Sequence, residues 1–277
     1  MELNGYRIET TRRRGISLFP IGDIHAGSSA CDERKVRGTV KRILDDPLAY
    51  WLFMGDACEF INYQDKRFDA KTCAPWLRLR DLNDIVQIQA DWIIELFKPI
   101  REKCIGWHDG NHEETIRLKF GRDIAAYMAK ALGAKYLSYS ALTMLSVDDG
   151  KTSHCKVFSH HGIGGGRYDG AKINSLQMSG RWIDADLYLQ GHNHSCISSV
   201  NPCLSIRMKH DDGEGVEWEE QDRAFVNTGT YFRTYYRDRN KASSSYAEKK
   251  AFPPSKIGTP EIHIGFDPLK ISFKSPE

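Results

Sequence analysis

The chain lacks the features that would place it outside the cell or in a membrane. Its seven cysteines are an odd number and form no C-x-x-C pair, which argues against a disulfide framework and a cysteine-bound zinc site. No apolar run is long enough to span a bilayer, and the first residues lack the basic head and apolar core of a signal peptide. We therefore expect a soluble cytoplasmic protein with no membrane partner.

The chain also lacks a strong charge of either sign. Its formal net charge is +2 over 277 residues, whereas nucleic-acid-binding domains usually carry a clear basic excess or patch. The balance leaves nucleic acid open as a partner without favouring it, and it gives no indication of the oligomeric state. With 40% hydrophobic and 27% charged residues, the composition and length suit one large α/β domain over residues 1–277.

What the chain does contain is a set of short apolar runs, each followed by glycine and a carboxylate. Residues 50–54 lead through Gly55 to Asp56, and residues 16–21 lead through Gly22 to Asp23 and His25. Such runs are typical of buried parallel strands, whose carboxyl ends open onto a crevice. The helical spacing of apolar residues in 32–44 predicts a right-handed βαβ unit, which places Asp23 and Asp56 at one edge of a sheet.

Three further blocks, at 110–113, 159–162 and 191–194, continue this design with histidines and an asparagine at expected strand ends. The five blocks together supply carboxylates, imidazoles and one amide, which are the ligands of paired divalent metals. Asp56 is the ligand expected to bind both metals, because a carboxylate has two oxygens. The predicted metal ligands are Asp23, His25, Asp56, Asn111, His160, His192 and His194. We expect Mn²⁺, with Fe, Zn²⁺ or Ni²⁺ as alternatives, because the mixed oxygen and nitrogen donors suit all of these metals and do not choose among them.

Periodicity predicts much of the remaining secondary structure. Helices are expected at 81–103, with Pro99 kinking or ending the first, and at 114–132. Strands are expected at 104–108 and 186–190, and a hairpin at 140–147 and 154–159. From residue 196 to 277 the alternating pattern predicts a β-rich extension that forms a terminal antiparallel layer.

Three irregular segments each allow two interpretations. Residues 57–80 mix aromatic and cationic side chains and form either a lid over the site or a packed surface loop. Residues 231–250 form either a groove for single-stranded nucleic acid or a solvated loop. The glycines of 162–166 provide backbone freedom near the metals, or they expose amides to a phosphate with help from Arg167.

The five blocks, from Asp23 to His194, resemble the calcineurin-like metallophosphoesterase superfamily, with its D-x-H, G-D, G-N-H-E, H-G and G-H-x-H pattern. The resemblance implies a four-layer α/β/β/α sandwich, in which two mixed β-sheets are flanked by helices, and a dinuclear metal site. One metal would be held by Asp23, His25, Asp56 and His194, and the other by Asp56, Asn111, His160 and His192.

The resemblance also assigns roles beside the metals. His112 would be the catalytic histidine, oriented by Glu113 or Asp109, and Asn111 would draw charge from the phosphoryl oxygens. With His160 as the ligand, His161 would lie just behind the ligands and contact substrate together with Arg167. The alternative is that His161 takes the ligand place itself.

The implied activity is a hydrolase that cleaves phosphomonoesters or phosphodiesters by in-line attack of a metal-bridging hydroxide. The arginines that protein phosphatases of the superfamily carry beside these blocks are replaced by His108-Asp109 and by 57–59, which counts against protein dephosphorylation. A DNA or RNA nuclease is the alternative. A non-catalytic scaffold is less favoured, because no ligand block is missing.

Overall fold

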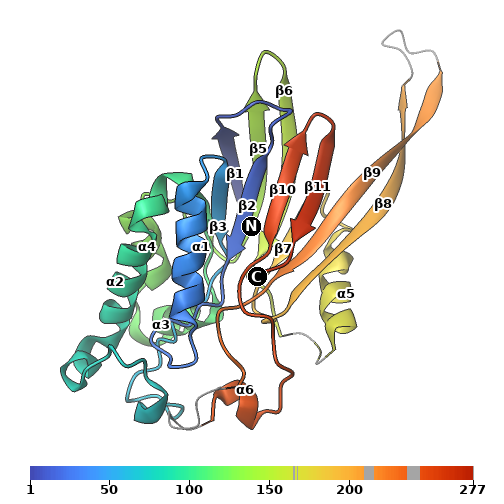
Figure 1. Cartoon of the computed structure of the whole chain (residues 1–277). Coiled ribbons are helices and arrows are strands. Elements are labelled where there is room, and N and C mark those ends of the chain that lie inside the picture. The colour runs from blue at the N-terminus through green and yellow to red at the C-terminus, as the bar shows by residue number, and fades with distance from the viewer. Residues whose placement is uncertain (165, 167, 209–214, 236–243, 277) are drawn as a thin grey trace.

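Two β-sheets packed face to face form the centre of the protein. The computed structural model describes residues 1–164, 166, 168–208, 215–235 and 244–276. Helices α1 (Glu33–Asp45), α2 (Ile85–Phe97) and α4 (Ile124–Ala131) cover one sheet, and α5 (Asp169–Ser179) covers the other (Figure 1). The α/β/β/α sandwich predicted from the sequence is therefore confirmed.

The first sheet, in the described residues, has five strands in the order β11-β10-β2-β3-β4. Its parallel part consists of β2 (Ile16–Ile21), β3 (Ala49–Phe53) and β4 (Cys104–Trp107), while β10 (Glu261–Phe266) and β11 (Leu269–Lys274) are antiparallel. Helix α1 joins β2 to β3, which is the expected βαβ unit. The carboxyl ends of β2, β3 and β4 therefore lie at one edge.

The second sheet has the order β1-β5-β6-β7-β9-β8. Its strands are β1 (Glu2–Ile8), β5 (Ser140–Asp148), β6 (Thr152–His160), β7 (Leu187–Gln190), β9 (Val216–Thr228) and β8 (Cys196–Met208). Strands β6, β7 and β9 are parallel, and β5 and β6 form the predicted hairpin. The first strand was not expected, because most of its side chains are exposed and its pattern is polar.

The predicted terminal antiparallel layer is wrong. Strands β8 and β9 extend the second sheet, and the far half of their hairpin projects from the body, whereas β10 and β11 extend the first sheet (Figure 1). The reason is burial, since Ile262 and Ile264 of β10 pack in the core between the two sheets. An alternating pattern predicts strands but does not choose which sheet they join.

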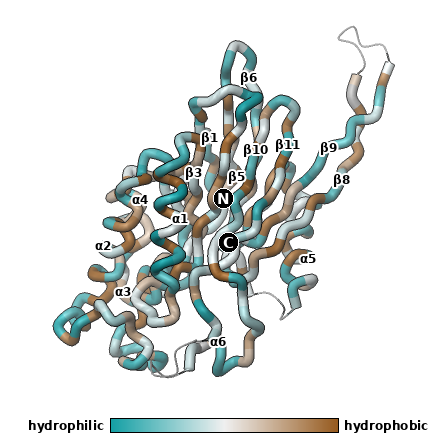
Figure 2. The backbone as a smooth tube through the Cα atoms, in the orientation of Figure 1, coloured by the Kyte–Doolittle hydropathy of each residue, from teal (hydrophilic) through white to brown (hydrophobic). Residues whose placement is uncertain are grey.

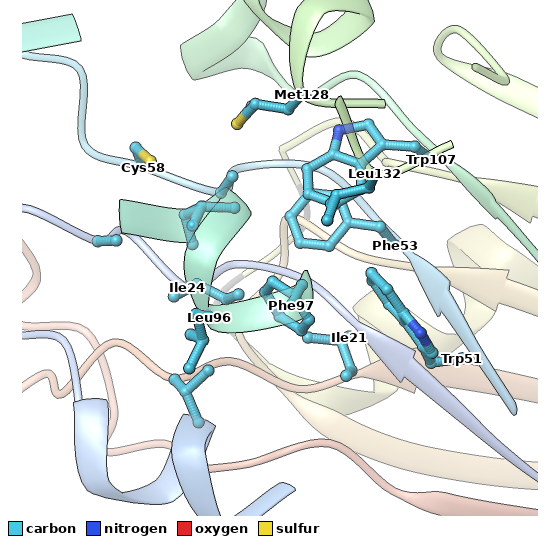
Figure 3. Packing of buried hydrophobic residues seen from close by; sticks show 14 of the residues in the cluster. Ile21, Ile24, Trp51, Phe53, Cys58, Leu96, Phe97, Trp107, Met128 and Leu132 are labelled. Atoms are coloured by element: carbon cyan, nitrogen blue, oxygen red, sulfur yellow. The ribbon is translucent and has the colours of Figure 1, made fainter. Parts of the chain in front are cut away.

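Strand alternation divides the apolar side chains of the first sheet between two cores. Leu18 and Leu52 face the second sheet, whereas Phe19, Trp51 and Phe53 face the helices. On the helix side the ring of Phe53 stacks on Trp107 with centroids 3.8 Å apart (Figure 3). Figure 2 shows apolar segments along the central strands and hydrophilic segments on the outer helix faces. Both sides of these strands are thus packed, which holds their carboxyl ends in place.

The helices differ in length from those predicted. The expected helix at 81–103 is α2 flanked by 3₁₀ turns at Leu79–Asp84 and Lys98–Lys103, and Pro99 lies just after its end. The expected helix at 114–132 is two helices, α3 (Asn111–Phe120) and α4, because Gly121 adopts a left-handed conformation that ends α3. The remaining short helices are Ala70–Thr72 and α6 (Tyr246–Lys249). Among the described residues, none of these helices has the length and apolar character to cross a bilayer.

Candidate metal centre

Five strand ends bring the predicted polar blocks to one place. Asp23 and His25 follow β2, Asp56 follows β3, and His192 and His194 follow β7. Hydrogen bonds join these turns directly: the N–H of Asp23 donates to the backbone carbonyl of Gly55 at 3.0 Å, and the N–H of His192 donates to the side-chain Oδ2 of Asp23 at 2.9 Å. The two sheets therefore meet at these turns.

The side chains form two adjoining groups. In one, Asp23 Oδ1 lies 3.3 Å from His194 Nε2, which lies 3.1 Å from His25 Nε2. In the other, His161 Nε2 lies 3.5 Å from Asp56 Oδ2 and 3.2 Å from Asn111 Oδ1. His192 has a ring nitrogen close to both His161 and Asp56, and His25, Asp56 and His112 form a third group between these two.

These groups fit divalent cations. Asp23 Oδ1 and His25 Nδ1 are buried and make no well-aligned hydrogen bond within the described part of the chain, although His194 Nε2 and a Glu59 carboxylate oxygen lie 3.3 Å from them. Two imidazole nitrogens that face each other at 3.1 Å, as in His25 and His194, need either a proton or a cation between them. Carboxylate oxygens and imidazole nitrogens converging in this way are donors that Mn²⁺, Fe and Zn²⁺ accept.

The backbone at these residues is strained. Asp23, His25, Asp56, His192 and His194 all have positive φ angles, between 49° and 64°. Residues with side chains rarely adopt this left-handed conformation, and strain of this kind costs about 1–3 kcal/mol per residue and gathers at functional sites. The surrounding packing maintains this strain. The strained conformation sets the direction of five predicted ligand side chains, which gather in the two adjoining groups.

Two glycines allow the close approach of the turns. A Cβ atom on Gly110 would lie 2.3 Å from the backbone nitrogen of Asp56, and one on Gly55 would lie 2.5 Å from His161 Nδ1. Any side chain at either position would push Asp56 or His161 out of place. The glycines in the Gly-Asp and Gly-Asn-His blocks are therefore required by packing.

Glu113 holds the backbone around Asp56 instead of orienting His112. Its buried carboxylate accepts hydrogen bonds from the N–H groups of Asp56, Ala57 and Gly110 at 3.1, 2.7 and 3.1 Å. The carboxylate of Asp109, the other expected partner of His112, accepts a bond from Tyr136 instead. These contacts make Glu113 a positioning residue for the ligand turn.

His112 is oriented by a residue that the sequence patterns did not reveal. Its Nδ1 lies 2.6 Å from the carbonyl oxygen of Glu59, an acceptor, so Nδ1 carries the proton and Nε2 is left free. The Glu59 carboxylate also lies 3.3 Å from His25 Nδ1. Glu59 follows the Gly-Asp block by three residues, in a segment without periodicity, and no signal in the sequence distinguishes it.

Neighbouring charges favour the charged forms of Asp56 and His112 although both side chains are buried. Burial opposes ionisation of Asp56, but the neighbouring His161, His112 and His25 hold its pKa well below the usual range. Burial likewise favours neutral His112, yet the carboxylates of Asp56 and Glu59 raise its pKa. Asp56 is thus anionic, and His112 is suited to carry a proton near neutral pH.

The structure places His161, not His160, among the metal-binding groups. His160 belongs to none of these groups, and its ring stacks on Phe158 and packs against Tyr139. Phe158 and His160 share one face of β6, the face covered by α5, whereas His161 follows the strand end and its Nδ1 bonds the carbonyl of Met54 at 2.7 Å. The structure therefore favours His161 over the predicted His160 as the candidate ligand.

A cavity of about 720 Å³ lies over the site. His25, Asp56, Asn111, His112, His192 and His194 form its floor, and Ile61, Lys66, Arg67, Phe68, Asp69 and Thr72 of the segment 57–80 line one side. That segment therefore borders the site, as its lid interpretation requires. Arg167 lies outside the described residues, as do residues 236–243 of the segment 231–250.

Comparisons with known proteins give distant structural matches. No family model and no curated protein matches the chain. Vps29 of Entamoeba histolytica, as a single mutant, is 14% identical, with 94% of this chain and 98% of that chain covered and a TM-score of 0.36. A predicted phosphoesterase of Streptococcus pneumoniae is also 14% identical, with 94% and 90% covered and a TM-score of 0.34.

A third similar structure is the calcineurin-like phosphoesterase YfkN of Bacillus subtilis. It is 11% identical, with 85% of this chain and 94% of that chain covered and a TM-score of 0.33. It carries the name of the superfamily that the sequence motifs resemble. Likeness at these identities and scores carries no conclusion about activity, so function has to be argued from the site.

Proposed function

We propose that the protein is a calcineurin-like metallophosphoesterase that hydrolyses small phosphate esters with two divalent metal ions, Mn²⁺ being favoured. The observation that supports this most is the pair of adjoining groups of candidate metal ligands beneath a cavity. Asp56 belongs to one group, and its carboxylate lies 3.9 Å from His25 of the other. The proposed ligands are Asp23, His25, Asp56, Asn111, His161, His192 and His194. When bound, the metals would polarise phosphoryl oxygens and lower the pKa of water at the site.

The side chains around the metals have separate tasks. The amide oxygen of Asn111 lies 3.2 Å from His161 Nε2. It is an uncharged metal ligand, so it adds no negative charge where an anionic substrate must approach. The Nδ1–H of His112 is held by the Glu59 carbonyl, so in the imidazolium form the second proton, on Nε2, is the one available to the departing oxygen. The raised pKa of His112, due to Asp56 and Glu59 against the effect of burial, suits this task.

The test is hydrolysis of p-nitrophenyl phosphate and bis-p-nitrophenyl phosphate by protein loaded with Mn²⁺. Activity on at least one ester is expected, and Asp56→Asn should lower both activity and Mn²⁺ affinity by about 100-fold or more, because even residues that only support ligands cost 10–100-fold. Asp45→Asn, at an exposed position of α1, is the control. Wild-type protein that binds Mn²⁺ but hydrolyses neither ester would favour a non-catalytic scaffold instead.

A further inference from the structure

A buried lysine outside the sequence motifs borders the proposed active site. Lys172 lies on α5, its side chain is only 10% exposed, and it lines the same cavity as His192 and His194. The other lysines and arginines that line the cavity among the described residues, Lys66, Arg67 and Lys249, are exposed. Since lysine is seldom buried unless its charge is compensated, the position of Lys172 needs an explanation.

Among the described residues, the contacts of Lys172 compensate its charge only in part. Its Nζ donates a hydrogen bond to Ser195 Oγ, and it lies 3.7 Å from Asp169 Oδ1, a carboxylate that is 70% exposed. An ammonium group has three donors, and a surface carboxylate at that distance contributes little. An anion in the cavity would supply a further acceptor to an ammonium group whose side chain is largely shielded from water.

The surroundings of Lys172 also favour an anion. Ser195, its hydroxyl partner, directly follows His194, so the lysine is tied to a turn that carries metal-binding residues. Gly164 and Gly166, which precede α5, line the same cavity, so the amino-terminal end of this helix borders it. Helix amino termini carry partial positive charge and attract phosphate.

We propose that Lys172 binds a phosphoryl oxygen of the substrate, and of the phosphate product, beside the metals. This inference rests on the proposed function and deepens it, because it adds a substrate-binding residue that no metal-binding motif contains. It also gives the cavity a preferred side for the phosphate, between the turn that ends in Ser195 and the start of α5.

Inorganic phosphate provides a probe that does not depend on turnover. Isothermal titration of the Mn²⁺-loaded protein with phosphate should show about 10- to 100-fold weaker binding for Lys172→Met, the loss expected of a charge-assisted hydrogen bond. Mn²⁺ affinity, titrated separately, should stay within about twofold of wild type. The control is Lys98→Met, at a surface position that pairs with Glu95.

Two results would overturn the inference. Unchanged phosphate affinity in Lys172→Met is one, and a fall in Mn²⁺ affinity large enough to account for the weaker phosphate binding is the other, since it would mean that Lys172 only supports the ligand turn. If Lys172→Met does not fold, Lys172→Gln retains a hydrogen-bond donor near Ser195 but removes the charge, and it should weaken phosphate binding about 10-fold. No change in that variant would also reject the inference.

These outcomes are separable from those for the proposed function. Wild-type protein that binds phosphate through Lys172 but hydrolyses no ester would reject the hydrolase and keep the anion site. Active wild-type protein whose Lys172→Met variant matches it in KM for p-nitrophenyl phosphate and in phosphate affinity would reject the anion site alone.

Discussion

The carboxylate of Glu113 accepts a hydrogen bond from the backbone N–H of Asp56, with Oε2 and the nitrogen 3.1 Å apart. Two residues 57 positions apart are thereby joined, and the left-handed backbone of Asp56 is held where its side chain meets His161. The same carboxylate binds the N–H groups of Ala57 and Gly110. Glu113 therefore connects the turns after β3 and β4.

Replacing Glu113 by alanine should destabilise the protein and weaken metal binding together. Three buried N–H groups would lose their acceptor, and each unsatisfied buried group costs about 1–3 kcal/mol. We expect the free energy of unfolding, measured in urea, to fall by about 3 kcal/mol or more, and Mn²⁺ affinity to fall about 10- to 100-fold. Glu114→Ala, at the next and partly exposed position, should change neither quantity appreciably.

Separate alanine variants of the two adjacent histidines should differ sharply. His161→Ala removes a ring within 3.5 Å of Asp56 and should lower Mn²⁺ affinity about 100-fold or more, whereas His160→Ala removes a ring that packs on Phe158 and should leave it nearly unchanged. Calorimetric titration with Mn²⁺ decides the matter. The reverse ranking would restore His160 as the ligand.

His112→Gln should slow catalysis in a way that depends on the leaving group. General acid catalysis contributes about 10²- to 10⁴-fold, and it matters most when the departing oxygen is a poor leaving group. We expect a large loss of kcat for alkyl phosphate esters and a much smaller loss for p-nitrophenyl phosphate. If Mn²⁺ affinity falls instead, His112 is a ligand in the group that it forms with His25 and Asp56.

The buried imidazole of His108 should make the protein sensitive to acid. Its Nδ1 bonds the carbonyl of Ser138 and its Nε2 bonds the hydroxyl of Ser159, and burial lowers its pKa from 6.5 to about 4. Between pH 6.5 and about pH 4, His108 binds a proton in the unfolded chain but not in the folded protein. The stability from this residue is therefore complete above pH 6.5 and is lost as pH falls toward 4.

The loss attributable to His108 should be about 2 kcal/mol at pH 5. His108→Gln keeps one donor and one acceptor but cannot bind a proton, so the decrease in unfolding free energy between pH 7 and pH 5 should shrink by about that amount. Denaturant titrations at the two pH values measure it. An identical decrease in wild type and variant would assign the acid sensitivity to other groups.

Much of the site could be predicted because each ligand block lies at the end of an apolar strand. Residues 16–21 and 50–54 are apolar except for Ser17, so both faces of these strands are buried and their ends lie at one edge. The pattern therefore predicted that Asp23, His25 and Asp56 would meet, and the distances agree. It could not predict Glu59, which acts on His112 through its backbone carbonyl, an atom that every residue has.

The order of strands and polar blocks along the chain was enough, by itself, to indicate an α/β domain and the sheet edge where the polar residues gather, because strands buried on both faces are apolar in sequence. The two-sheet sandwich followed from the resemblance of the motifs to a known superfamily. Only the tertiary structure placed His161, and not His160, beside Asp56, brought Lys172 of α5 to the cavity and divided the last four strands between two sheets. These outcomes depend on which segments distant in sequence pack against one another, and the local residue pattern of a segment does not specify its packing partners.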